Sequence, residues 1–135
     1  MNTHVNLSDN TEHLAIAEKL SSAYVNKDIA ALREIYHENA EIWYNFDDLS
    51  QPLEENFKRL DVFLGAFNEM AFKNIRRFAT EKGFVQQHDL AGTHMNGESL
   101  NNCPACFIAT VEAGKVTRLE EYIDPTPIFT WLSTN

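Results

Sequence analysis

The sequence predicts an α+β domain in which N-terminal helices pack on a curved, mixed or antiparallel sheet and enclose a cone-shaped pocket. Two patterns predict this fold. Apolar residues recur every three or four positions in the first half of the chain, as on helices, and alternate with polar residues in the second half, as on strands. Because helices cover only part of a curved sheet, a cavity suited to a small ligand is expected between the layers.

Three helices are expected in the first half of the chain. The first covers residues 10–26, and the second begins after Asp28, a favourable N-cap residue. The third covers about residues 53–70 and has the strongest periodicity. Its apolar stripe consists of Leu53, Phe57, Leu60, Leu64 and Phe67.

Strands are expected where β-branched and aromatic residues gather or alternate with polar ones. The first covers residues 41–46 and is followed by a turn over residues 47–52. Four more are predicted at residues 72–80, 84–93, 107–112 and 116–123, separated by glycine-containing turns. No repeat or linker-like segment interrupts the chain, so residues 1–135 are expected to form a single domain.

Composition excludes several classes of partner. Eleven Lys and Arg oppose twenty Asp and Glu, which gives a net charge of −9, so nucleic acid is not an expected partner. No apolar run approaches the roughly 20 residues that span a bilayer. The N-terminal residues lack the apolar core of a signal peptide, and a cytoplasmic protein without membrane contact is therefore expected.

The strand predicted at residues 116–123 presents a carboxylate on an apolar face. Leu119, Glu121 and Ile123 share one side because successive strand residues point to opposite faces. Glu121 is therefore either a satisfied structural acid or the working group of a pocket.

The strand at residues 84–93 offers two candidate partners for Glu121. Gln87 and Asp89 lie on one of its faces, and Gln86 and His88 lie on the other. If Asp89 shares a cavity with Glu121, repulsion and desolvation should raise at least one carboxyl pKa, as acid–base catalysis near neutral pH requires. The alternative is that both acids lie at a wet rim or bind an arginine, since structural ion pairs also perturb pKa values.

Further residues are predicted to line the pocket and contact its ligand. Trp43 offers an apolar wall, and Asn45 could orient a carbonyl, hydroxyl or water. Tyr24 could present its hydroxyl, although an ordinary core tyrosine is an equal alternative. Leu119 and Phe67 complete the predicted wall, together with the Gln87 amide.

The cysteine pair Cys103 and Cys106 suggests a redox dithiol or half of a zinc site. The pair leads into a strand-like segment, whereas a reactive dithiol usually opens a helix, so buried reduced thiols are expected. The histidines show no metal-ligand spacing. Neither a cofactor nor a metal is expected.

The whole pattern resembles the SnoaL-like members of the superfamily that contains ketosteroid isomerase, nuclear transport factor and limonene epoxide hydrolase. The resemblance covers residues 14–124. It is carried by the helix starting at Lys27-Asp28, by Trp43-Tyr44-Asn45, by the turn at Gly92-Thr93-His94, and by the segment from Gly114 to Asp124. It implies a cystatin-like cone with a ligand pocket, a fold that hosts many functions.

The resemblance also implies roles for individual residues. Asp89 and Glu121 correspond to the two acids of limonene epoxide hydrolase, Asn45 to its water-holding amide and Trp43 to its tyrosine, whereas Gln87 replaces its arginine. Leu20 and Cys106 fall at the oxyanion positions of ketosteroid isomerase and cannot donate as required. The polyketide cyclases of the superfamily have no arginine at this position, so Gln87 fits the cyclase pattern better than the epoxide hydrolase pattern.

The expected function is a cofactor-independent isomerase, cyclase, dehydratase, hydratase or hydrolase acting on a small apolar ligand that bears oxygen. The alternative is a non-catalytic small-molecule-binding or accessory domain of the same fold. A homodimer is also expected, because an open sheet whose outer face mixes polar and apolar groups commonly finds a partner, as in the superfamily that the sequence resembles. The residues predicted on this face are Gln86, His88, Arg118, Glu120 and Tyr122.

Overall fold

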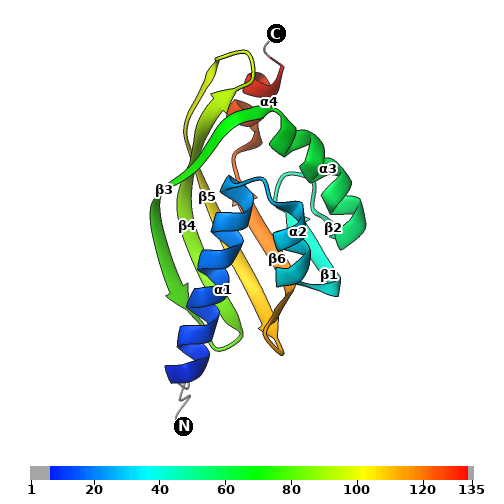
Figure 1. Cartoon of the computed structure of the whole chain (residues 1–135), viewed down its shortest axis with the longest axis vertical. Coiled ribbons are helices and arrows are strands. Elements are labelled where there is room, and N and C mark those ends of the chain that lie inside the picture. Colours follow the sequence, from blue (N-terminus) through cyan, green and yellow to red (C-terminus); the bar gives the residue numbers. More distant parts are fainter. Residues whose placement is uncertain (1–6, 134–135) are drawn as a thin grey trace.

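The computed structural model describes residues 7–133 and contains four helices and six strands in that range (Figure 1). In chain order they are α1 (Leu7–Val25), α2 (Ile29–Ile35), β1 (Tyr36–Tyr44), β2 (Leu49–Pro52), α3 (Leu53–Gly65), β3 (Phe67–Ala79), β4 (Gly83–His94), β5 (Ser99–Glu112), β6 (Lys115–Ile123) and α4 (Pro125–Leu132). The strands form one mixed sheet in the order β2-β1-β6-β5-β4-β3. Every neighbouring pair is antiparallel except β1 and β6. The predicted α+β class is confirmed.

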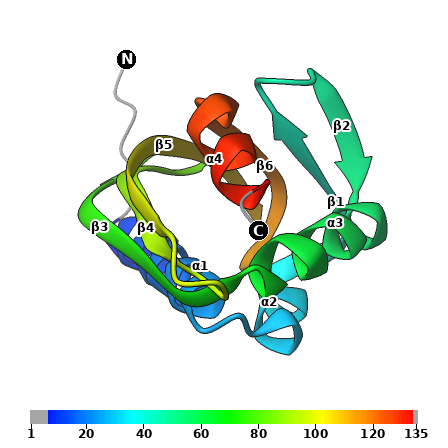
Figure 2. The same ribbon diagram turned by 90° about the horizontal axis from the view of Figure 1, so that it is seen from above.

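The sheet curves, and the helices lie against its concave side (Figure 2). α1 packs against β3 and β4, and α3 packs against β1. The main core lies between these layers, and a second cluster of buried residues joins α4 to β4, β5 and β6. The cone predicted from the order of helices and strands is therefore closed at one end by a helix.

Local sequence signals explain where α2 and α3 begin. The Asp28 side chain accepts a hydrogen bond from the Ala31 N–H, so Asp28 is the N-cap that the sequence predicts. Pro52 precedes α3, and two acidic residues in its first turn complement the helix dipole. The buried face of α3 carries Leu53, Asn56, Phe57, Leu60 and Leu64.

Several predicted boundaries are wrong, among them the end of α3 and the starts of β1, β3 and β5. α3 ends at Gly65, and β3 begins at Phe67. Phe67 matches the spacing of the helical stripe by chance, which is why the helix was predicted too long. Its side chain is buried instead in the second cluster, between the sheet and α4. β1 begins at Tyr36 and β5 at Ser99, earlier than predicted. The segment 47–52 contains the short edge strand β2 as well as a turn.

The helix α4 was not predicted. It is only eight residues long, too short to show a helical period, but its start is conventional. Asp124 caps it by accepting a hydrogen bond from the Thr126 N–H, and Pro125 occupies the first turn, where no backbone donor is needed.

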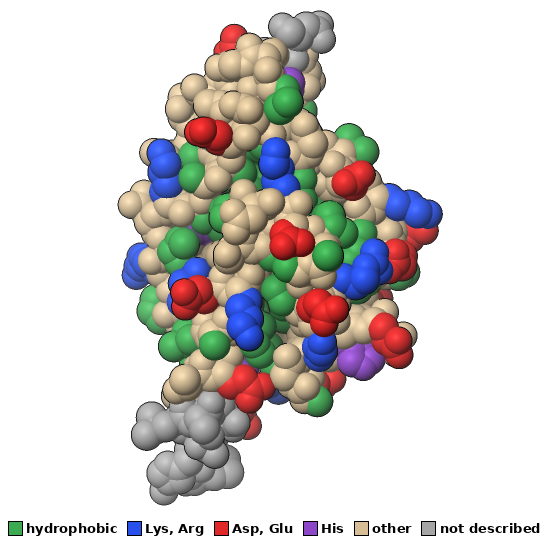
Figure 3. Space-filling view, viewed as in Figure 1, with side chains coloured by type: hydrophobic (Ala, Val, Ile, Leu, Met, Phe, Trp, Pro, Cys, Tyr) green, Lys and Arg blue, Asp and Glu red, His purple; other side chains and the backbone are tan. Residues whose placement is uncertain are grey.

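Most of the N-terminal segment that the predicted location depends on lies outside the described residues. Within residues 7–133, no helix is both long and apolar enough to cross a bilayer. Acidic and basic side chains are interspersed over the face in Figure 3.

Candidate active site

A cavity of about 250 Å³ opens between the sheet, α3 and α4. Its polar lining residues are Tyr24, Tyr44, Arg59, His88 and Glu121, and the rest of the lining is apolar or aromatic. The volume lies just below the roughly 300–1,000 Å³ usual for sites that bind drug-sized ligands, so a ligand of one or two rings would fit.

Glu121 places a carboxyl group in this apolar surrounding. It lies on β6 opposite Tyr44 of β1 and Phe107 of β5, with its side chain toward the cavity. No cation pairs with it among residues 7–133. Burial raises the pKa of Glu121 to about 8, because the charged form loses its hydration without gaining a counter-charge.

Tyrosine hydroxyls surround the same region. The hydroxyls of Tyr24 and Tyr36 are 2.9 Å apart and hydrogen-bonded, and both rings are buried. Burial raises the pKa of all three residues Tyr24, Tyr36 and Tyr44, and the charge of Glu121 adds to the effect on each. These hydroxyls therefore remain protonated hydrogen-bond donors at any physiological pH.

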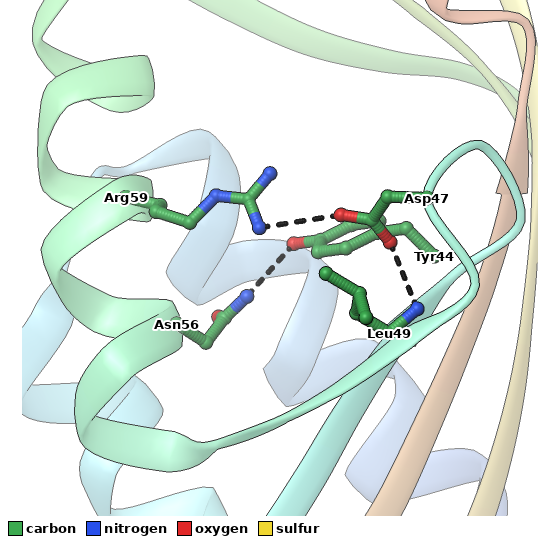
Figure 4. A network of polar contacts seen from close by, with 5 residues as sticks. All are labelled: Tyr44, Asp47, Leu49, Asn56 and Arg59. Carbon is green, nitrogen blue, oxygen red and sulfur yellow. Dashed lines mark hydrogen bonds and ion pairs between the residues drawn. The ribbon is translucent and has the colours of Figure 1, made fainter.

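Tyr44 is held by residues from α3 and from the turn after β1 (Figure 4). The Asn56 side-chain Nδ2 donates to the Tyr44 hydroxyl at 3.1 Å, so the tyrosine's own hydrogen is left for another acceptor. Arg59 pairs with Asp47 at 3.4 Å, and its guanidinium carbon lies 5.9 Å from the centre of the Tyr44 ring. Asp47 in turn accepts from the Leu49 N–H, which fixes the turn.

His88 is a further titratable group that lines the cavity from the sheet. Its ring stacks on Phe72, with centroids 4.0 Å apart, and meets Phe107 edge-on. Burial lowers the pKa of His88 to about 4; the Asp89 carboxylate opposes this shift and Arg77 adds to it. His88 is therefore neutral at pH 7.

The prediction that Asp89 and Gln87 share the cavity with Glu121 is wrong. The two residues line a separate shallow depression on the opposite face of the sheet, where Asp89 accepts a hydrogen bond from Asn74 at 2.8 Å. Within residues 84–91 of β4, each face carries two apolar and two polar residues, so alternation alone could not decide between them. The bulkier apolar pair, Phe84 and Leu90, marks the inner face.

Trp43 and Asn45, which were predicted to line the cavity, do not line it. The Trp43 ring packs on Tyr122 of the outer face and donates to Asp48, and the Asn45 side chain accepts from the Ile123 N–H. Asn45 thus extends the pairing of β1 and β6 and lies outside the cavity lining. The alternate residues Tyr44 and Phe46 line the cavity instead, and the apolar series Ile42, Tyr44 and Phe46 was the signal for this.

The remaining predicted residues divide as follows. Tyr24 and Glu121 line the cavity, as expected. Leu119 is buried in the main core beside it, and Phe67 is buried in the second cluster, so neither reaches the lining. Tyr44, Arg59 and His88 are the polar lining residues that the sequence analysis missed.

The cysteines are both free, and they lie on β5. Cys103 is buried, Cys106 is half-buried, and burial raises the pKa of both thiols, which disfavours the reactive thiolate. Within residues 7–133, no cluster of three or more His, Cys, Asp or Glu is arranged to hold a metal ion.

Comparison with solved structures identifies the fold class. A candidate SnoaL-like polyketide cyclase from Jannaschia sp. CCS1 matches with a TM-score of 0.78 at 15% identity, covering 98% of this chain and 99% of that one. A candidate isomerase from Bacillus subtilis matches with a TM-score of 0.78 at 10% identity, covering 93% and 95%. An NTF2-like protein of unknown function from Cytophaga hutchinsonii gives 0.67 at 16%, covering 96% and 99%.

The chain therefore has the SnoaL-like, NTF2-like fold that the sequence resemblance implied. Structures with this fold include candidate cyclases, a candidate isomerase and proteins of unknown function. No family model and no curated protein matches the sequence. At these identities the likeness establishes the fold, and the chemistry has to be argued from the cavity itself.

Proposed function

We propose that this chain binds a small, largely apolar ketone or related oxygen-bearing molecule and that Glu121 moves a proton on it without a cofactor. One observation carries the proposal: Glu121 lies in an apolar cavity with no cationic partner among the described residues. Its pKa of about 8 keeps both the acid and the carboxylate accessible near neutral pH, which is the condition for transferring a proton in both directions.

The proton transfer would proceed through an enolate. The Glu121 carboxylate takes a proton from the carbon next to the carbonyl, and the electron pair of that C–H bond moves onto the carbonyl oxygen. The free hydrogen of the Tyr44 hydroxyl, left available by Asn56, can bond to this oxygen as its charge grows. In a ketone with a β,γ double bond the electron pair extends over a dienolate, and Glu121 returns the proton to the γ carbon. The carbonyl re-forms and the double bond moves into conjugation with it, which isomerises the molecule; a saturated ketone such as 2-tetralone regains the proton at the same carbon and shows only exchange.

The test uses 2-tetralone, a two-ring ketone, as the probe. In D₂O, NMR follows the exchange of its C1 hydrogens for deuterium. The wild type is expected to accelerate exchange, with a rate that rises as pH passes 8. Glu121→Gln should lose this acceleration, because the amide cannot accept the proton.

Glu120→Gln is the matched control, since Glu120 is the next residue on β6, points to the outer face and pairs with Arg118. Equal exchange rates in wild type and Glu121→Gln would refute the proposed proton transfer.

A non-catalytic binding function is the second candidate, and one observation favours it. At pH 7 Glu121 is mostly protonated and His88 is neutral, so the cavity holds no fully ionised base. Saturable binding of 2-tetralone, with exchange no faster than in buffer at any pH from 6 to 9, would support this candidate against catalysis.

A further inference from the structure

A buried hydrogen-bond chain connects the protein surface to His88. Arg77 Nε donates to Gln86 Oε1 at 2.8 Å, and the Ser21 hydroxyl donates to the same oxygen at 3.0 Å. The other end of the amide, Gln86 Nε2, lies 3.0 Å from His88 Nδ1. Gln86 itself is fully buried, so no water competes for these bonds.

The chemistry of these groups fixes the direction of every bond. An arginine Nε can only donate, so the Gln86 atom facing it must be the oxygen. The atom facing His88 is then the NH₂ group, which can only donate. His88 Nδ1 must therefore accept, and the proton of the neutral imidazole is carried by Nε2.

The ring cannot easily turn to escape this arrangement. Phe72 stacks on its face with an interplanar angle of 15°, and Phe107 contacts it at 66°. The charged groups that act on His88 are Asp89 and Arg77. His88 is neutral at pH 7, so its ring carries one proton, and that proton is either on Nδ1 or on Nε2. None of the described residues bonds to Nε2, while His88 is among the residues that line the cavity.

We propose that Gln86 is a positioning residue that holds His88 as the Nε2–H tautomer, so that His88 offers the cavity a hydrogen-bond donor and cannot act as a base. The tautomer follows from the protein alone. The second part rests on the proposed function and deepens it: the ligand needs an acceptor oxygen, such as a ketone carbonyl, within reach of His88 Nε2.

The tautomer is measured directly in ligand-free protein labelled with ¹⁵N-histidine, by long-range ¹H–¹⁵N correlation at pH 7. The expected spectrum for His88 has a protonated Nε2 and an unprotonated Nδ1. A protonated Nδ1 in the wild type would overturn the proposal, whatever the protein binds.

Gln86→Glu reverses the polarity of the chain with almost no change in shape. The carboxylate still accepts from Arg77 and Ser21, but it must also accept from His88, so the one proton of the neutral imidazole should move from Nε2 to Nδ1. Gln87→Glu is the matched control, because it makes the same change at the next residue, exposed on the other face, and should leave the tautomer unchanged. If Gln86→Glu gave the wild-type tautomer, Gln86 would not be setting it.

Ligand preference supplies the second measurement. The ratio of the affinities for 2-tetralone and for tetralin, which lacks the oxygen, should fall about five- to tenfold in Gln86→Glu, as expected for one lost hydrogen bond, and stay constant in Gln87→Glu. An unchanged ratio would refute the donor role. Failure of Glu121-dependent exchange would refute the proposed function and leave the tautomer measurement standing, so the two failures can be told apart.

Should Gln86→Glu fold poorly, Arg77→Gln tests the same chain from its surface end. This variant removes the Arg77 Nε–H, which can only donate and therefore holds the Gln86 oxygen in place. The Gln86 amide can then rotate by 180° and exchange its oxygen and nitrogen, so His88 should show a mixture of tautomers. A single unchanged tautomer in Arg77→Gln would contradict the proposed direction of the chain.

Discussion

At the scale of single residues, Glu121 and His88 show how one physical cause drives two pKa values apart. Burial disfavours the charged form of each group, so it raises the pKa of the acid to about 8 and lowers that of the imidazole to about 4. Both side chains are therefore predominantly neutral at pH 7. In this state they act as hydrogen-bonding groups, and ionising Glu121 is the step that would create a base.

This raised pKa has a consequence for stability. The Glu121 carboxyl ionises near its ordinary value of 4.5 in the unfolded chain and near 8 in the folded protein. Between these pH values the folded state holds more protons than the unfolded state, so the free energy of unfolding falls as pH rises from about 4.5 to 8. The loss should be on the order of 2–4 kcal/mol.

Urea unfolding at pH 5, 6.5 and 8.5 measures this effect when wild type is compared with Glu121→Gln. The variant cannot ionise, so the stability of the wild type relative to the variant should decrease with pH. A relative stability that is constant over this range would show that the Glu121 pKa is not raised by folding.

Among the helices and strands, α4 has two roles: one of its faces packs on the sheet, and another lines the cavity. Trp131 is 5% exposed, its ring lies 4.5 Å from that of Phe67, and its Nε1 donates to the Glu98 carbonyl. Phe129 is 52% exposed and lines the cavity. One face therefore anchors the helix to the sheet, and the other contributes to the cavity wall.

Trp131→Ala should lower the free energy of unfolding by about 3–5 kcal/mol, as expected for a large buried side chain. Phe129→Ala, on the same helix, should change stability by less than about 1 kcal/mol and weaken binding of 2-tetralone. Chemical denaturation and a binding titration measure the two effects. Comparable destabilisation by both variants would contradict this division of α4.

At the scale of the whole molecule, the outer face of the sheet remains open in the single chain. Ile108 and Tyr122 are exposed there by 38% and 45%, and Trp43 packs on Tyr122 beside them. Their neighbours include the Arg118–Glu120 ion pair, which gives the mixed surface that the dimer prediction started from. Gln86 and His88, which that prediction also used, face inward instead.

The homodimer stays a prediction, and light scattering at micromolar concentration tests it. The wild type should have twice the mass of one chain, and Ile108→Glu should shift it toward monomer by placing a charge in the interface. Met95→Glu is the control, because Met95 is 65% exposed in the turn between β4 and β5, away from this face. A monomeric wild type would refute the prediction.

Local patterns in the sequence were enough to predict the fold class, most helices and strands and the identity of one cavity acid. The stripe of α3 and the alternation of β6 are local patterns that several residues repeat, and the cap at Asp28 is a local signal carried by one residue. Glu121 could be placed because Leu119 and Ile123 on either side identify the buried face of its strand.

Which face of β1 and of β4 meets the cavity could not be predicted from local patterns and depends on how the strands and helices pack together. In β4 both faces have the same mixture of polar and apolar residues, and a shift of one position exchanges Asp89 for His88. The chain from Arg77 through Gln86 to His88 joins β3 to β4, and α4 closes the cavity from the far end of the sequence. Contacts of this kind depend on strands and helices being brought together, which no local pattern records.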